Sequence, residues 1–358
     1  MPYPDLPNAT STVGRTKALA ACLLLLAACS GSHTDLAADS SSASVGGAGG
    51  GGGAGSSQGG FSNGGSPPVI EPDGPPKLTV VNGIVDRDAM ALCFLESPAN
   101  ASDAAEPWPE AALDYAHAAS VSLPGAPIPE DTDIEILVLT GDLGAAAASD
   151  CRAIADDPFG FAGLEVLSLG VAPASTFTAP RSTLLAVTGC FGGETHDGDD
   201  LEDICGPSYT PDSPTPSVVF APLSRIGSGA GVGLQVVNAT GALDSIAIYF
   251  RSAIEDTLEQ VVAVEVVPGA AAPFPPNTAL SASELGGPSS ATLRAIIDML
   301  AASEDIVSLG DAMEGGGITA GDFVNGGNIA LIAVGPSPGA PTNSWWNPFA
   351  VVAVVADP

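Results

Sequence analysis

The stretch Leu78-Thr-Val-Val-Asn-Gly-Ile-Val-Asp-Arg-Asp-Ala-Met-Ala-Leu-Cys-Phe94 recurs without gaps as Leu234-Gln-Val-Val-Asn-Ala-Thr-Gly-Ala-Leu-Asp-Ser-Ile-Ala-Ile-Tyr-Phe250. The two copies share the Val-Val-Asn core, one aspartate and the closing phenylalanine. An internal repeat sets the architecture of a chain. We therefore expect two copies of one domain, at 77–226 and 234–358, joined by a glycine-rich linker at 227–233.

Each copy of the repeat reads as two strands around a turn. Leu-x-Val-Val is a short β-rich run, and the asparagine after it tolerates the left-handed conformation that ends a strand. Apolar residues then alternate with period two, as in a half-buried strand. These alternating residues are Met90, Leu92 and Phe94 in the first copy and Ile246, Ile248 and Phe250 in the second.

Further strands are expected from apolar runs bounded by Gly, Pro and Asn. In the first copy these are 134–139, 164–169, 184–188 and 218–220, and in the second they are 261–267, 329–334 and 349–355. Such spacing is typical of β-sandwiches. One helical insertion is predicted in the second copy, because Ser290 can cap a helix in which Leu293, Ile296, Ile297 and Leu300 lie at i, i+3, i+4 and i+7. The predicted fold class is thus all-β, with two tandem sandwiches.

The N-terminus has the features of an export signal. Arg15 and Lys17 precede an apolar run, Ala18 to Ala28, that is too short to span a bilayer. Leu26-Ala27-Ala28-Cys29 resembles the lipobox of bacterial lipoproteins, which predicts a signal peptide at 1–28 and a lipid-bearing Cys29. The alternative is an ordinary signal peptide with incidental cysteines.

The residues after the lipobox predict a flexible tether and a cellular location. Residues 29–76 are rich in Gly, Ser and Pro and cannot bury enough apolar area to order themselves, so we expect a flexible tether. Ser30 after the cysteine resembles the outer-membrane sorting pattern. The predicted location is the cell envelope, with acyl chains such as palmitate holding the protein at the outer membrane.

Charge excludes one class of partner. The chain has 9 basic against 41 acidic residues and a net charge of -32. Phosphate binding needs clustered Lys and Arg, so no nucleic-acid partner is expected. The acidic surface either keeps the protein soluble or binds cations. We expect membrane contact through the lipid anchor alone and no cofactor.

Four cysteines remain once Cys22 and Cys29 are assigned to the signal and the anchor. They are Cys93, Cys151, Cys190 and Cys205, an even number for an oxidising compartment, with three possible pairings. Cys93 lies on the outward parity of its strand and can reach a loop, so we favour Cys93–Cys151 with Cys190–Cys205. Free buried thiols are the alternative. A zinc site is not expected because no C-x-x-C pair occurs.

Several of these features together resemble a known family. They are the opening Leu-x-Val-Val-Asn, the Asp-x-(Met/Ile)-Ala strand, Cys93, the later Ser149-Asp150-Cys151 and the run Val218-Val-Phe-Ala-Pro-Leu223. The chain is similar there to bacterial surface lipoproteins with tandem β-sandwich domains, catalogued as a domain of unknown function. The resemblance covers about residues 77–358. It implies immunoglobulin-like sandwiches and an envelope location, and it implies no catalytic residues. The second copy departs from it in lacking cysteines.

Two segments are candidates for binding. The segment between Cys190 and Cys205 carries Glu194, Asp197, Asp199, Asp200 and Asp203, whose carboxylates could hold Ca²⁺, although their spacing departs from the EF-hand pattern. The alternative is a solvated acidic loop. His196 in this segment is either a metal ligand or simply exposed. Trp345 and Trp346 form either a stacking platform for a ligand or the packing of a hairpin.

No residue stands in a recognisable nucleophile context. His117 and His196, the histidines of the globular region, have no serine or cysteine motif around them. The sequence therefore predicts a non-enzymatic, envelope-anchored structural or interaction module with an unknown extracellular or envelope ligand. The alternatives are a carbohydrate- or calcium-binding surface protein and an envelope hydrolase.

Overall fold

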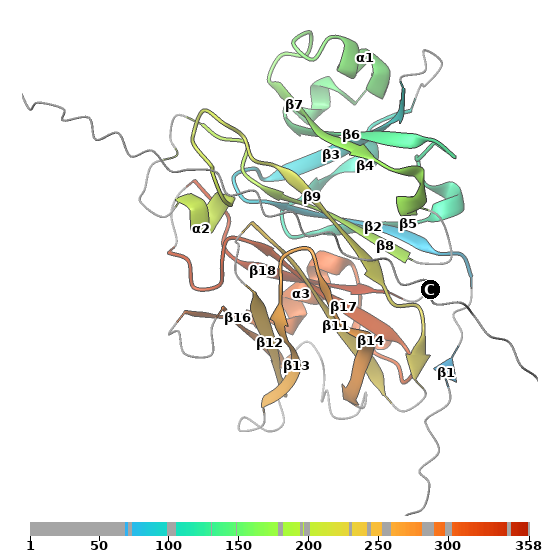
Figure 1. Cartoon of the computed structure of the whole chain (residues 1–358), viewed down its shortest axis with the longest axis vertical. Coiled ribbons are helices and arrows are strands. Elements are labelled where there is room, and N and C mark those ends of the chain that lie inside the picture. The colour runs from blue at the N-terminus through green and yellow to red at the C-terminus, as the bar shows by residue number, and fades with distance from the viewer. Residues whose placement is uncertain are drawn as a thin grey trace, which may run out of the picture. The chain divides into compact units, whose positions relative to one another are not determined.

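Short strands dominate the chain, and the predicted all-β, sandwich-like fold is confirmed (Figure 1). The computed structural model describes residues 69–70, 74–98, 105–129, 131–147, 149–177, 182–193, 196, 201–228, 231–241, 245–252, 259–280, 290–297, 303–341 and 345–356. All of them belong to one compact unit, Asn63–Pro358. The predicted signal peptide, Cys29 and most of the predicted tether lie outside the described residues.

The first repeat forms two four-stranded sheets. One has the order β5-β2-β8-β9 and the other β4-β3-β6-β7. The strands are β2 (Lys77–Ile84), β3 (Ala89–Ser97), β4 (Trp108–Asp114), β5 (Ala118–Ser122), β6 (Asp133–Gly141), β7 (Leu164–Ala172), β8 (Ser182–Gly189) and β9 (Ser217–Leu223). Two short helices, α1 (Cys151–Asp156) and α2 (Leu201–Cys205), and three 3₁₀ turns, η1 (Leu123–Gly125), η2 (Leu143–Ala145) and η3 (Ala174–Phe177), lie in its connections.

The second repeat forms another pair of sheets, with the orders β14-β11-β17-β18 and β13-β12-β15-β16. Its strands are β11 (Val232–Thr240), β12 (Ile246–Arg251), β13 (Glu259–Val266), β14 (Ala271–Leu280), β15 (Thr292–Ile296), β16 (Glu304–Ser308), β17 (Asn328–Gly335) and β18 (Ala350–Val355). Helix α3 (Leu309–Gly316) and the turn η5 (Ala320–Asp322) connect β16 to β17.

The duplication extends far beyond the 17-residue match in the sequence. The eight strands of each repeat pair in the same order, and in both repeats the first strand pairs in parallel with the seventh and antiparallel with the fourth. Thus Val80 lies opposite Leu185 in the first repeat, as Val236 lies opposite Leu331 in the second. These strands carry near-continuous apolar runs because both of their faces are covered.

The helix predicted over residues 290–300 is wrong. Residues Thr292–Ile296 form β15, which pairs antiparallel with β12 and β16. Leu293 and Ala295 face the core while Arg294 between them points outward, which is the alternation of a strand. The apolar residues also fit a helical period over this short run, and cross-strand pairing decided the outcome. A helix does occur in the second repeat, but it is α3, which Ser308 caps and Gly317 ends.

Apolar packing occurs within each repeat and between the two. Met90, Leu92 and Phe94 point into the core of the first repeat, as predicted, and Ile246, Ile248 and Phe250 into that of the second. A third buried cluster joins the β2-β8-β9 side of the first repeat to the β11-β17-β18 side of the second, with Leu184, Ala186, Ile332 and Val354 among its members. The facing sheets of the two repeats therefore share a core.

A buried asparagine recurs at the end of the first strand in each repeat. The side chain of Asn82 donates to the Leu113 carbonyl oxygen at 2.9 Å and accepts from the Ile84 amide at 3.0 Å. Asn238 makes the same pair of bonds, to the Val266 carbonyl oxygen at 2.9 Å and from the Thr240 amide at 3.1 Å. Because buried backbone groups need partners, this residue fixes the turn that leads into the second strand.

Two short strands lie in segments expected to be tether and linker. β1 (Val69–Ile70) pairs antiparallel with β10 (Gly227–Ser228). β11 already begins at Val232, and the side chain of Asn328 donates to the Ser224 and Ile226 carbonyl oxygens beside it. The connection between the repeats is thus hydrogen-bonded to the second repeat. Within the described ranges, no helix is long and apolar enough to cross a membrane.

Candidate functional site

Both predicted disulfides are present, and each fastens a loop at one end of the first repeat. Cys93, on the outer face of β3, is bonded to Cys151 at the start of α1. Cys190, just after β8, is bonded to Cys205 at the end of α2. The outward parity of Cys93 places its sulfur against the loop that carries α1, which is why this pairing forms.

His196 is buried, so the expectation that it is exposed is wrong. The residue is only 7% exposed, and its imidazole ring stacks on the Trp345 ring with the ring centroids 3.8 Å apart. Its Nδ1 is hydrogen-bonded to the Tyr209 hydroxyl, and its Nε2 lies 3.6 Å from a carboxylate oxygen of Asp86. His196, which lies between Cys190 and Cys205, thus connects its segment to Asp86, Tyr209 and Trp345.

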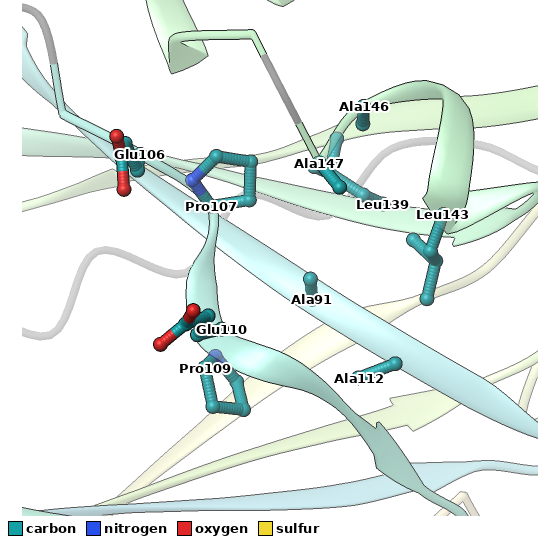
Figure 2. A pocket seen from close by; sticks show the side chains of 10 residues that line it. All are labelled: Ala91, Glu106, Pro107, Pro109, Glu110, Ala112, Leu139, Leu143, Ala146 and Ala147. Atoms are coloured by element: carbon teal, nitrogen blue, oxygen red, sulfur yellow. The ribbon is translucent and has the colours of Figure 1, made fainter.

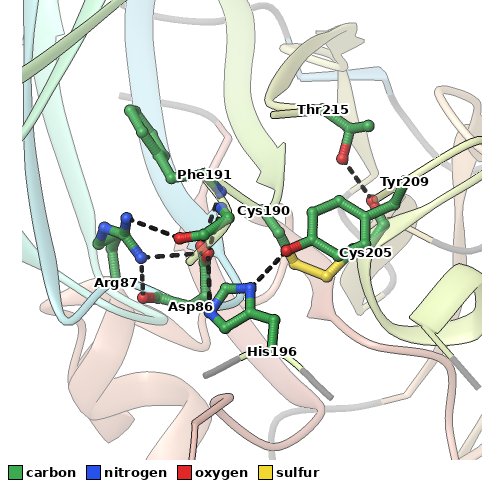
Figure 3. Close-up of a disulfide and its surroundings, with 9 residues drawn as sticks. Asp86, Arg87, Cys190, Phe191, His196, Cys205, Tyr209 and Thr215 are labelled. Atoms are coloured by element: carbon green, nitrogen blue, oxygen red, sulfur yellow. Dashed lines mark hydrogen bonds and ion pairs between the residues drawn. A yellow bond between two sulfur atoms is a disulfide. The ribbon is translucent and has the colours of Figure 1, made fainter. Parts of the chain in front are cut away.

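Asp86 organises the loop that follows β8. Its buried carboxylate accepts hydrogen bonds from the Phe191 amide at 2.9 Å and the Gly192 amide at 2.8 Å (Figure 3). Arg87 lies 3.1 Å from the same carboxylate. Hydrogen bonds from backbone amides and a guanidinium are what a buried carboxylate requires.

Burial decides the protonation of this cluster. It holds the pKa of His196 below its ordinary value, an effect that Asp86 opposes and Arg87 reinforces. Burial, followed by the charge of Asp86, raises the pKa of Tyr209 to about 12. At neutral pH, therefore, His196 is uncharged and Tyr209 keeps its proton, which suits a hydrogen-bonding network that holds the loop in place.

The second repeat completes this end of the first. The Asn347 amide donates to the Val85 carbonyl oxygen at 2.7 Å, and its side chain donates to the Arg87 carbonyl oxygen at 3.2 Å. Trp345 and Trp346 are half-buried between β17 and β18 and pack edge to face on each other and against the Cys190–Cys205 cluster. Their position supports hairpin packing rather than a free stacking platform.

An open depression lies beside the cluster. Its volume is about 450 Å³, within the range of small-ligand sites. Its residues come from five segments: the turn after β2, the loop after α1, the start of β7, the loop before α2 and the loop after α2. They are Arg87, Pro158, Phe159, Leu164, Glu165, Val166, Leu167, Phe191, Gly192, Gly193, Pro211, Asp212 and Pro214.

Each wall of this depression is attached to a disulfide. The wall with Phe159 follows α1, which Cys151 anchors to β3. The wall with Phe191 directly follows Cys190. Phe159 is 97% exposed although its loop follows the helix that is anchored by Cys151. An exposed aromatic side chain beside a depression is available for contact with a ligand.

Ion pairing fixes the floor of the depression. Arg87 binds both carboxylate oxygens of Glu165, at 2.7 and 3.1 Å, and lies over the Phe191 ring at 5.3 Å. Burial raises the pKa of Glu165, but the hydrogen bonds and charge of Arg87, with the Thr140 hydroxyl, outweigh it, and the pKa lies below its usual value. Glu165 is therefore an anion at neutral pH, and Arg87 forms ion pairs with Glu165 and Asp86.

The acidic segment is described only at its end. Glu194, Asp197, Asp199 and Asp200 lie outside the described residues. Asp203 is exposed on α2, and its carbonyl oxygen accepts from the Ser337 amide. In the part of the chain that the structure describes, no group of three His, Cys, Asp or Glu side chains is placed to hold a metal ion. His117 lies in the turn between β4 and β5, where its Nδ1 contacts the Tyr115 carbonyl oxygen.

A second pocket lies over the outer face of β3. Figure 2 shows alanine and leucine side chains along it, with Glu106 and Glu110 to one side. Its volume of about 60 Å³ is far below that of a small-molecule site. It has room for a few water molecules only.

Neither the protein-family models nor the curated proteins gave a match to this chain. The sequence prediction missed Asp86, Arg87, Phe159 and Glu165. One signal was present for the first two: the repeat aligns Asp86 and Arg87 with Ala242 and Leu243, so the charged pair is specific to the first copy. Phe159 and Glu165 carry no such signal, since only the tertiary structure brings them beside Arg87.

Proposed function

We propose that this chain is a non-enzymatic, envelope-anchored binding module whose ligand site is the depression beside the Cys190–Cys205 disulfide. The observation that carries the proposal is that both walls of the depression are fastened by disulfides while the Phe159 ring stands fully in solvent. Fixing loops before binding lowers the entropy that a ligand must overcome. Phe159 lines this depression and is available for apolar contact with a ligand.

Covalent chemistry supports the proposed envelope location. Disulfides form and persist in oxidising compartments, so the two bonds favour an exported protein. The apolar run and Leu26-Ala27-Ala28-Cys29 favour export with lipid attachment at Cys29. A glycine- and serine-rich stretch between the anchor and the first strand gives the binding module reach from the membrane.

The arrangement around His196 favours binding over hydrolysis. A hydrolase needs a nucleophile, a base and an open space in contact with both. The ring of His196 is instead covered by Trp345, and its Nδ1 is occupied by the buried Tyr209 hydroxyl, whose pKa is raised. These contacts suit a structural role for His196.

Complementation of a deletion strain tests the proposal. Phe159→Ala removes an exposed ring without opening the core, so the variant should fold and anchor normally yet fail to restore the phenotype. Ile306→Ala is the control, since Ile306 is an exposed apolar residue on β16, the edge strand of the second repeat that corresponds to β7. Full rescue by Phe159→Ala would overturn the proposed site.

Hydrolysis is tested separately in the same strain. His117→Ala combined with His196→Gln removes both described histidine side chains of the globular region. If the double variant is folded and anchored and still rescues, a non-enzymatic module is supported. Loss of rescue in a folded, anchored double variant would favour an envelope hydrolase instead.

A further inference from the structure

The depression runs along a free strand edge. Four consecutive residues of β7, Leu164 to Leu167, line it. Side chains of consecutive strand residues point to opposite faces, so a cavity that touches all four lies at the edge of the strand. β7 ends its sheet, in the order β4-β3-β6-β7, and pairs on its other side with β6. Among the described residues, no strand covers the edge that faces the depression.

The two halves of this edge differ. Beyond Ser168 the pairing with β6 shifts register, and Gly170 has a φ of 99°, so this half is bulged. Bulges are a common way in which proteins block pairing at a sheet edge. The half along the depression, by contrast, pairs residue for residue with β6 from Leu164 to Leu167. The Leu164 N–H already donates to the Phe161 carbonyl oxygen at 3.2 Å. The outward N–H and C=O groups that follow it, as far as Leu167, keep the regular spacing that another extended chain needs.

The charge of the depression indicates which class of partner it favours. The depression holds the carboxylates of Glu165 and Asp212, while its one basic side chain, Arg87, already binds Glu165 and Asp86. The whole chain carries a net charge of -32. An anionic ligand would be repelled, whereas Lys or Arg side chains would be attracted. Phe159 and Phe191 provide apolar contact on the two walls.

We propose that the depression binds an extended, basic segment of another protein, which adds to β7 as a fifth strand of its sheet. Backbone hydrogen bonds to Glu165–Leu167 supply affinity. An apolar side chain packs between Phe159 and Phe191, and lysine or arginine side chains lie near Glu165 and Asp212. This inference rests on the proposed function, because it names the ligand class of the same site.

Fluorescence anisotropy with defined peptides tests it. The probes are labelled heptapeptides in which lysine alternates with valine, leucine or phenylalanine, and they are added to the purified full-length protein at physiological ionic strength. Binding is expected for at least one of them. It should be lost when alternate backbone nitrogens of that peptide are methylated, because one edge of the peptide then has no donors. Absence of binding by all three peptides would overturn the inference.

Matched variants separate the site from general electrostatics. Phe159→Ala should weaken binding about tenfold, as expected for a central aromatic contact, and Ile306→Ala should leave it unchanged. Asp212→Asn should weaken it about two- to fivefold. Asp311→Asn, an exposed residue on α3 with the same change in net charge, should have no such effect. Equal losses in both aspartate variants would contradict binding at this edge.

The outcomes distinguish the two proposals. If the methylated peptide binds as well as the unmethylated one while Phe159→Ala still weakens binding, strand addition is overturned and the binding site stands. If no basic peptide binds but Phe159→Ala still fails to complement the deletion strain, the ligand class is wrong and the proposed function is retained. If Phe159→Ala also complements fully, both proposals are overturned.

Discussion

Asn82 and Asn238, 156 residues apart in the chain, make the same two hydrogen bonds in the two repeats. Each side chain is fully buried and joins the end of the first strand to the third, through the carbonyl oxygens of Leu113 and Val266. A short run of shared sequence thus marks a shared structural device. The amide group supplies both the donor and the acceptor that this pair of hydrogen bonds needs.

Replacing either asparagine by leucine should lower stability. Asn82→Leu leaves the Leu113 carbonyl oxygen and the Ile84 amide without a side-chain partner, and an unsatisfied buried group costs about 1–3 kcal/mol. Asn238→Leu should cost a similar amount. Urea unfolding of both variants measures this, with exposed Ile306→Ala as the control. An unchanged midpoint would contradict the role given to these residues.

The two disulfides should differ in how much they contribute to the free energy of unfolding. Removing Cys93–Cys151, which spans 58 residues, should cost about 4 kcal/mol in the chain-entropy account, and removing Cys190–Cys205, which spans 15, about 3 kcal/mol. Paired Cys→Ala variants, unfolded under oxidising conditions, give these values. Non-reducing peptide mapping should recover the same two pairs. Any free thiol among Cys93, Cys151, Cys190 and Cys205 in the oxidised protein would refute the pairing.

His196 should make stability depend on pH. Burial holds its folded-state pKa below 6.5, while the unfolded chain keeps the ordinary value. Below about pH 6.5 the unfolded chain therefore binds a proton that the folded chain does not. The contribution of His196 is complete above that pH and decreases as pH falls toward the folded-state pKa. The stability advantage of the native protein over His196→Gln should thus be larger at about pH 7.5 than at about pH 5, in parallel denaturant titrations. An advantage that grows with acidity would instead mean that His196 is held protonated by Asp86.

Replacing Gly316 near the end of helix α3 by alanine should lower stability, although alanine favours helices. Gly316 lies against β18, and a Cβ at this position would overlap the Ala353 carbonyl oxygen. Gly316→Ala should therefore destabilise the protein by about 1–3 kcal/mol through overpacking. Gly125→Ala, where an added Cβ meets open space, is the control and should be nearly neutral. Thermal unfolding of the two variants makes the comparison.

Membrane attachment should depend on Cys29. Leu26-Ala27-Ala28-Cys29 ends the apolar run, so Cys29→Ala should abolish fatty-acid labelling and move the protein out of the membrane fraction. Cys22→Ala, in the earlier Leu-Ala-Ala-Cys, should change neither. Labelling that survives in Cys29→Ala would show that another residue is acylated.

The sequence by itself determined the features that depend on local period. Alternation at Met90, Leu92 and Phe94 predicted the buried face of β3, and the opposite parity of Cys93 predicted its bond to a loop. These inferences held because side chains of a strand alternate between faces wherever the strand lies. The match at 78–94 and 234–250 likewise revealed the duplication, since the same local pattern builds the same strand pair.

Only the tertiary structure decided the features that depend on distant partners. Leu293 fits a helix as well as a strand, and its pairing with Phe250 of β12 and Val307 of β16 made it a strand residue. His196 is buried because Trp345, from the far end of the other repeat, covers its ring. The depression exists because the turn after β2, the start of β7 and loops held by two disulfides meet at one place. Contacts between segments so far apart leave no periodic trace in the chain, because each segment satisfies its own local pattern regardless of which neighbour it meets.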